Sequence, residues 1–117
     1  MAPDNLAILV YSTAPNELVA EKIAKSLVKS NLAACINIIP QMTSIYRWEE
    51  KIERASECAL LIKTTTNHYP AIEKSITEQH PYDCPAIITL PVSNGYPPFL
   101  QWIKNETQLD ASDSTKS

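Results

Sequence analysis

The residue types best suited to chemistry gather in one short segment, residues 80–85, which reads His-Pro-Tyr-Asp-Cys-Pro. Imidazole, carboxylate and thiol groups are common metal ligands, and two prolines restrict the backbone that carries them. Ligand chemistry is therefore expected in this rigid polar loop. Two less specific interpretations compete with it: His80 caps carbonyl groups at a helix end, and Cys84 packs as a small apolar side chain.

A second group of candidates lies outside this loop. Lys63 stands in an otherwise apolar stretch, where a charge is costly unless it is paired or faces a wet cleft. A role in a ligand pocket and an ion pair with Glu57 or Asp83 are both consistent with this position. Tyr46 and Trp48 share one face of an extended segment, where aromatic side chains either pack between subunits or line a pocket there.

Length and composition limit the classes of function. The 117 residues are predicted to form one domain at residues 1–108 and a disordered polar tail at residues 109–117. The single glycine excludes the glycine-rich phosphate loops of kinases, ATPases and dinucleotide-binding proteins. A net charge of −3 argues against nucleic acid and anionic membranes as partners.

The cysteines and the missing catalytic motifs narrow the choice further. Cys35, Cys58 and Cys84 are odd in number and far apart, so they form neither a disulfide framework nor a zinc ribbon. A reducing, cytoplasmic location is expected for such a chain. The sequence shows no Ser-His-Asp order, no paired buried carboxylates and no HExxH motif, and we predict no enzymatic activity.

The first part of the chain predicts a strand followed by a helix. The continuous apolar run at residues 6–11 is typical of a central strand covered on both faces. Thr13 or Ala14 is expected to cap the helix, and Asn31 to end it in the left-handed conformation. Apolar residues at helical spacing predict its buried side: Ala20, Ile23, Ala24, Leu27 and Val28.

Residues 32–48 form an extended segment far longer than an ordinary strand of roughly five or six residues. Pro40 cannot donate a ladder hydrogen bond, so we expect the strand to bend there at an edge or a bulge. A charged turn at residues 49–54 and a returning strand at residues 57–65 complete a long hairpin. Its unpaired backbone edge predicts pairing with another subunit.

The remaining segments complete a βαββαβ order with one further helix. A helix capped by Asn67, with His68 at the surface, precedes a strand at residues 86–90, and the pair Pro97 and Pro98 opens the last helix. The α+β ferredoxin-like fold satisfies this order, because right-handed crossovers place both helices on one face of an antiparallel sheet. The positions expected to be buried on the later helices are Tyr69, Ile72, Ile76, Phe99, Trp102 and Ile103.

Several short motifs follow one another in a characteristic order: Thr13-Ala14-Pro15, Leu32-Ala33-Ala34-Cys35-Ile36-Asn37-Ile38-Ile39-Pro40, Thr43-Ser44-Ile45-Tyr46 with Trp48, Ile62-Lys63-Thr64, His80-Pro81-Tyr82, Leu90-Pro91-Val92 and Leu100-Gln101-Trp102. Together they resemble the CutA family of divalent-cation tolerance proteins. The resemblance implies a ferredoxin-like homotrimer whose long strands pair across subunits, related in fold to the PII signalling proteins. It also implies a link to copper tolerance, as in bacterial members, or to acetylcholinesterase processing, as in animal members.

The resemblance bears on the metal ligands as well. Bacterial members to which copper binding is attributed use a cysteine just before the Thr-Ala-Pro motif and two adjacent histidines before Pro-Tyr. This chain has Ser12, Gln79 and His80 at those positions, and serine and glutamine are poor ligands for Cu(II). Asp83 replaces the usual glutamate, and Cys84 adds a thiol.

The leading hypothesis is a non-enzymatic, cytoplasmic homotrimer that binds a divalent metal weakly. Cu(II) is the most plausible ion, with His80 and Asp83 or Cys84 as its ligands near a subunit interface. This ligand set rests mainly on the family resemblance.

Two alternatives are kept beside it. The first is a PII-like sensor, in which a pocket between subunits binds a small anionic metabolite through Tyr46, Trp48, Lys63 and Tyr82. The second is a trimeric scaffold for another protein. Neither alternative involves nucleic acid or a membrane.

Overall fold

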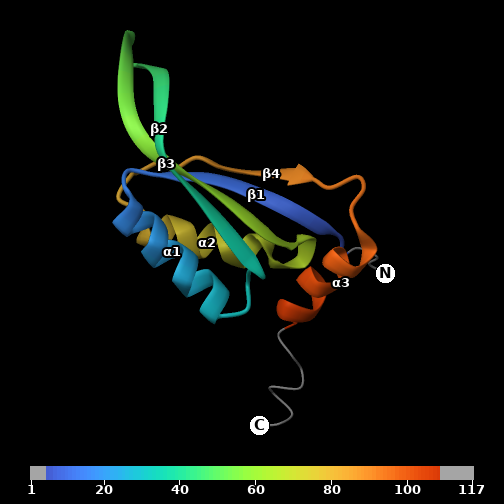
Figure 1. Cartoon of the computed structure of the whole chain (residues 1–117). Helices are drawn as coiled ribbons and strands as arrows, with labels where there is room; N and C mark the ends of the chain where they lie inside the picture. The colour runs from blue at the N-terminus through green and yellow to red at the C-terminus, as the bar shows by residue number, and fades with distance from the viewer. Residues whose placement is uncertain (1–4, 109–117) are drawn as a thin grey trace.

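The strands and helices follow the order expected for a ferredoxin-like fold. The computed structural model describes residues 5–108, and its four strands form one antiparallel sheet in the order β2-β3-β1-β4. The predicted α+β class and ferredoxin-like arrangement are confirmed (Figure 1). The elements are β1 (Ala7–Ala14), α1 (Glu17–Lys29), β2 (Cys35–Trp48), β3 (Lys51–Thr65), the 3-10 turn η1 (Thr66–His68), α2 (Tyr69–Gln79), β4 (Ile87–Pro91) and α3 (Pro97–Glu106).

Helices α1 and α2 cover one face of the sheet, and the core lies between these two layers (Figure 1). Ile8 and Val10 of β1 point into this core, while Leu9 and Tyr11 on the opposite face are only half-buried. We call that opposite face the open face. The largest apolar side chains that are fully buried are Ile23, Leu27, Leu60, Ile62, Ile72, Ile76 and Val10.

The hairpin of β2 and β3 rises beyond the sheet and both helices (Figure 1). The pairing register shifts between Ile39 and Met42, and Gln41 adopts a φ of 57°. This β-bulge confirms the bend predicted at Pro40. It separates the part of the hairpin that belongs to the sheet from the part that projects.

The turn of the hairpin is shorter than predicted. Trp48 pairs with Lys51, which leaves only Glu49 and Glu50 in the turn, with φ values of 50° and 67°. A two-residue turn with positive φ at both positions matches the twist of the strands, but costs a non-glycine residue roughly 1–2 kcal/mol. The prediction of a broad charged turn at residues 49–54 was therefore wrong. Two glutamates are not the residues that usually indicate this type of turn.

Two predicted helix caps are also wrong. Asn16 caps α1 and accepts a first-turn N–H at 2.9 Å, because Thr13 and Ala14 still belong to β1. Before α2 the chain forms η1, where the side chain of Asn67 accepts the hydroxyl of Thr65 at 2.6 Å instead of capping the helix.

Some of the other local predictions are confirmed, and others are wrong. Asn31 has a φ of 63° and ends α1 in the left-handed conformation, as predicted. His68 is buried at the start of α2, so its predicted surface position was wrong. On α3 only Ile103 is buried, whereas Phe99 and Trp102 stack with ring centres 5.7 Å apart and stay about two-fifths exposed.

The predicted disordered tail, residues 109–117, and the first four residues of the predicted domain lie outside the described residues. Between residues 5 and 108, no helix is both long and apolar enough to cross a membrane.

Candidate functional site

The loop that carries the candidate ligands, residues 80–86, connects α2 to β4 near the base of the projecting hairpin (Figure 1). His80 ends α2, and its backbone N–H bonds to the carbonyl of Ile76 at 2.9 Å. At the other end of the loop, the buried Ser12 of β1 donates its hydroxyl to the carbonyl of Ala86 at 2.7 Å. Both ends of the loop are thus held by hydrogen bonds.

The imidazole of His80 is buried, and both of its nitrogens have partners within the chain. Nε2 lies 2.7 Å from the carbonyl oxygen of Thr13, and Nδ1 lies 3.2 Å from the backbone nitrogen of Tyr82. A carbonyl only accepts and a backbone N–H only donates, so the neutral ring carries its proton on Nε2. A metal ion can reach His80 only by displacing one of these hydrogen bonds.

Asp83 and Cys84 differ from His80 because both are exposed to solvent. In the described part of the chain, no group of three or more His, Cys, Asp or Glu side chains is placed to hold a metal ion. The described residues of one chain therefore do not form a complete copper site, although Asp83 and Cys84 are two accessible donors at adjacent positions. The ligand set of His80, Asp83 and Cys84 stays a prediction.

Glu57 of β3 belongs to this region, and sequence reasoning missed it as a site residue. Ser44 of β2 donates its hydroxyl to Oε1 at 2.6 Å, and Tyr82 of the loop donates its hydroxyl to Oε2 at 3.1 Å. One carboxylate thus ties the loop to both strands of the hairpin. The role of Glu57 becomes apparent only from the strand register, in which Glu57 pairs with Met42 as the first pair after the bulge.

The environment of Tyr82 favours its neutral hydroxyl. Partial burial raises the pKa of Tyr82 above its ordinary value, and the hydrogen bond to Glu57, the charge of Glu57 and the nearby Tyr46 add to the rise. Tyr46 and Tyr82 are therefore the two predicted pocket residues that one chain brings near each other.

Lys63 lies near the C-terminal end of β3, away from the tip of the hairpin. Its Nζ donates to Oδ1 of Asn37, and lies 3.8 Å from Sγ of Cys35 and 5.9 Å from the ring centre of Phe99. Six residues of extended strand separate Lys63 from Glu57, about 20 Å at roughly 3.3 Å per residue. The ion pair considered between these two residues does not form, and no carboxylate pairs with Lys63 in the part of the chain that is described.

Trp48 ends β2 at the tip of the hairpin and is 61% exposed. Tyr46 pairs with Glu53, which lies ten residues, or about 33 Å, along β3 from Lys63. A single chain therefore spreads the predicted pocket residues along the hairpin. A pocket that contains Tyr46, Trp48, Lys63 and Tyr82 requires a second subunit, and stays a prediction.

The fold and this region define a ferredoxin-like protein with a long projecting hairpin and a polar loop bonded to its base. The family model described as "CutA1 divalent ion tolerance protein" matches residues 8–106. The chain belongs to the CutA1 family, which confirms the resemblance seen in its motifs.

Individual relatives agree with this assignment. "Protein CutA" from Mus musculus is 44% identical over 105 residues, which cover 90% of this chain and 59% of that protein. "Divalent-cation tolerance protein CutA" from Thermus thermophilus is 43% identical over 99 residues, covering 85% and 96%. The crystal structure of CutA1 from Oryza sativa has a TM-score of 0.87 at 36% identity, covering 93% of this chain and 100% of its own. The chain thus spans about three-fifths of the mouse relative.

Proposed function

We propose that this chain assembles as a homotrimer that binds divalent cations weakly, Cu(II) foremost, without catalysing a reaction. The name of its family, for divalent ion tolerance, supports the cation. We place the trimer in the cytoplasm, because all three cysteines are free and a reducing compartment keeps them so.

The observation that carries the assembly is the exposed apolar surface of the hairpin. Ile45, Trp48 and Ile52 are 69%, 61% and 63% exposed, on a stretch of β2 and β3 where these strands pair only with each other among residues 5–108. A two-stranded hairpin is marginally stable by itself, and an apolar edge strand attracts further strands. Ile88 and Leu90 add exposed apolar surface at the other edge of the sheet. A closed ring of three copies would cover both edges of every copy.

The loop geometry supports weak cation binding. Asp83 and Cys84 are accessible donors, whereas His80 would have to release Thr13 or Tyr82 before it could bind. Losing such a hydrogen bond weakens the binding of the metal by about 1 kcal/mol. Because the described part of one chain provides too few free donors, the others would come from water or from a neighbouring copy.

Calorimetric titration of Cu(II) into the purified oligomer tests this site. We expect the variant Asp83→Asn/Cys84→Ser to lose most of the binding heat, and Glu78→Gln, which removes an exposed carboxylate on α2, to keep it. Cys84→Ser is also titrated alone and free thiols are counted afterwards, because Cu(II) oxidises thiols. Binding that is unchanged in the double variant would exclude the loop, and an unchanged isotherm in His80→Ala would remove the histidine from the ligand set.

A second candidate function is a PII-like sensor of a small anionic metabolite, and Lys63 is the observation that favours it. The residue is half-buried, and its ammonium group has no carboxylate partner among the described residues. Such a cation attracts an anion. In this arrangement Lys63 of one subunit would face Tyr46, Trp48 or Tyr82 of another.

Thermal-shift measurements with nucleotides and carboxylates test the sensor. A ligand should raise the melting temperature of the wild type but not of Lys63→Met, while the control Lys104→Met on α3 should respond like the wild type. A screen in which no anion stabilises the protein counts against this function.

A further inference from the structure

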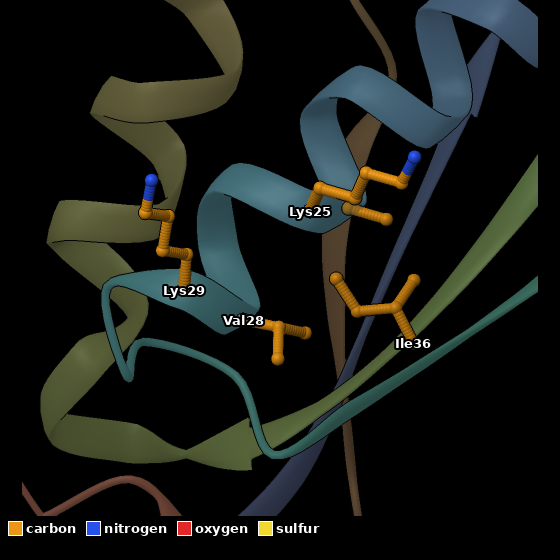
Figure 2. A pocket seen from close by; sticks show the side chains of 5 residues that line it. Lys25, Val28, Lys29 and Ile36 are labelled. Atoms are coloured by element: carbon orange, nitrogen blue, oxygen red, sulfur yellow. The ribbon is translucent and has the colours of Figure 1, made fainter.

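A shallow groove lies between α1 and β2, on the side of the sheet that the helices cover. The residues that line it enclose a volume of about 420 Å³ and are Ala24, Lys25, Val28 and Lys29 of α1 and Ile36 of β2 (Figure 2). Val28 follows the helical spacing of the buried residues of α1, yet it is 42% exposed. Ile36 packs against the core only in part. The groove therefore has an apolar lining on which one more apolar side chain would be stabilised.

The rim of the groove is positively charged. Lys25 and Lys29 are both exposed, one helical turn apart, and their ammonium groups point to different sides of Val28 (Figure 2). Neither lysine takes part in an ion pair among the residues that the structure describes. A segment that fits this groove would therefore combine an apolar side chain with acidic ones.

The end of α3 lies beside the end of α1. Asn31, which follows α1, donates its backbone N–H to the carbonyl of Val28 at 3.0 Å and its side-chain Nδ2 to the carbonyl of Glu106 at 3.2 Å. The buried Thr107 fixes the end of α3, because its hydroxyl donates to the carbonyl of Ile103 at 2.9 Å. One asparagine therefore links a residue of the groove to the last turn of α3, just before the described chain ends.

The residues that come next in the sequence suit the groove in reach and in charge. Residues 109–113 read Leu-Asp-Ala-Ser-Asp, which is one large apolar side chain followed by two acidic ones and no basic one. Leu109 follows Glu106 by three residues, which span up to about 10 Å when extended. Because only Asn31 stands between Glu106 and Val28, Leu109 can reach the groove without any change in α3.

We propose that residues 109–113 dock in this groove of their own chain. Leu109 packs on the apolar lining, and Asp110 and Asp113 face the two lysines at the rim. For these residues the docked segment replaces the expectation of a disordered tail. Its contacts use side chains of α1 and one face of β2, so the backbone edge of β2 stays available to the neighbouring copy in the proposed trimer.

Paramagnetic broadening in methyl NMR spectra of the intact oligomer tests this contact. The variant Ser114→Cys in a Cys84→Ser background carries a nitroxide just after the docked residues. We expect the methyl signals of Val28 and Ile36 to lose most of their intensity, and those of Ile52 near the tip of the hairpin to keep it. The Cys84→Ser protein treated with the same reagent corrects for any label on the other cysteines.

Charge reversal tests the pairing of the acidic residues with the rim. In the nitroxide-labelled protein, Lys25→Glu/Lys29→Glu should restore the methyl signals, because like charges then face each other. Asp110→Lys/Asp113→Lys should restore them for the same reason. Combining both sets of substitutions should broaden the signals again, since opposite charges are then paired in the reverse sense.

A matched control and mixed oligomers complete the test. Lys22→Glu/Lys74→Glu makes the same change of charge on exposed positions outside the groove, and the signals should stay broadened. Recovery in this control would reduce the effect to net charge, and absence of broadening in the labelled protein would exclude the docked segment. Oligomers with the nitroxide and the isotope label on different copies should show weaker broadening. Broadening that is equally strong there would mean that the neighbouring copy's segment covers the groove.

Discussion

The body of the molecule and its projecting hairpin use the same two strands in opposite ways. Within the body, β3 buries Leu60 and Ile62 almost completely beneath the helices. Beyond the bulge, the same strand exposes Ile52, and its partner strand exposes Ile45. The helices of one chain therefore cover this part of β3. The projecting part of the hairpin is paired only within itself, and its apolar side chains have no surface to pack against among the described residues.

The largest effect is expected when the apolar side chains of the hairpin are removed. Ile45→Glu/Ile52→Glu should convert the proposed trimer into monomers, because charges replace the apolar contact between subunits. Light scattering gives the mass, and far-ultraviolet circular dichroism checks that the body stays folded. Leu18→Glu is the control, since Leu18 is 80% exposed on α1. An oligomer of unchanged mass would show that the hairpin is not the interface.

The next largest effect should come from the core of the body. Ile62→Ala removes a fully buried side chain and should lower the free energy of unfolding by about 2–5 kcal/mol. Leu18→Ala, at a position of α1 that is 80% exposed, should cost clearly less. Urea denaturation at one fixed protein concentration measures both variants, because assembly also stabilises the fold. Equal losses would mean that the side chain of Leu18 is buried as deeply as the core.

A smaller loss is expected at the junction of body and hairpin. His80→Ala leaves the carbonyl of Thr13 and the N–H of Tyr82 without their partner, which should lower the free energy of unfolding by about 1–3 kcal/mol. Amide hydrogen exchange at Tyr82 should become faster in the variant. Exchange as slow as in the wild type would show that the imidazole does not hold the loop.

The smallest effect is a shift in the titration of Tyr82. Its pKa is raised in the folded chain, so its contribution to stability is complete below the ordinary tyrosine pKa of about 10 and is lost as the pH rises through the raised value. Glu57→Gln removes a negative charge and should lower the pKa of Tyr82 toward its ordinary value. Absorbance titration measures this as the difference between each protein and its Tyr82→Phe counterpart. An unchanged difference curve would contradict the bond between loop and hairpin.

The sequence predicted the body better than the hairpin, and the reason is physical. Buried residues recur at the period of a helix, so the spacing of Ile23 and Leu27 was enough to orient α1. Pro40 lacks a backbone N–H, and this was enough to place the bend. A turn depends on the dihedral angles of only a few residues, and its signal in the sequence is therefore weaker. Glu49 and Glu50 form a turn that glycine or asparagine usually marks.

The candidate site was predicted in its residue types but not in its connections. The loop lies at the base of the hairpin, where its histidine and tyrosine both have hydrogen-bonding partners. Periodicity could not show that both nitrogens of His80 would be occupied, because Thr13 is far away in the chain. Glu57 was missed because its contacts depend on a register that a bulge shifts.

That bulge also decides which chemistry each face of β2 presents. Before the bulge, even-numbered residues of β2 such as Ile36 lie toward the helices. From Ile39 to Met42, β2 advances by three residues while β3 advances by two. Beyond the bulge, even-numbered residues such as Ser44 and Tyr46 therefore lie toward the open face. Deleting Gln41 would restore uninterrupted alternation and leave Ser44 on the open face beside Glu57. If Gln41 stayed and the strand continued regularly from Ile39, Ser44 and Tyr46 would turn away from the open face, and Thr43 and Ile45 would turn toward it. The extra residue of the bulge thus decides that Tyr46, and not Ile45, shares a face with Glu57.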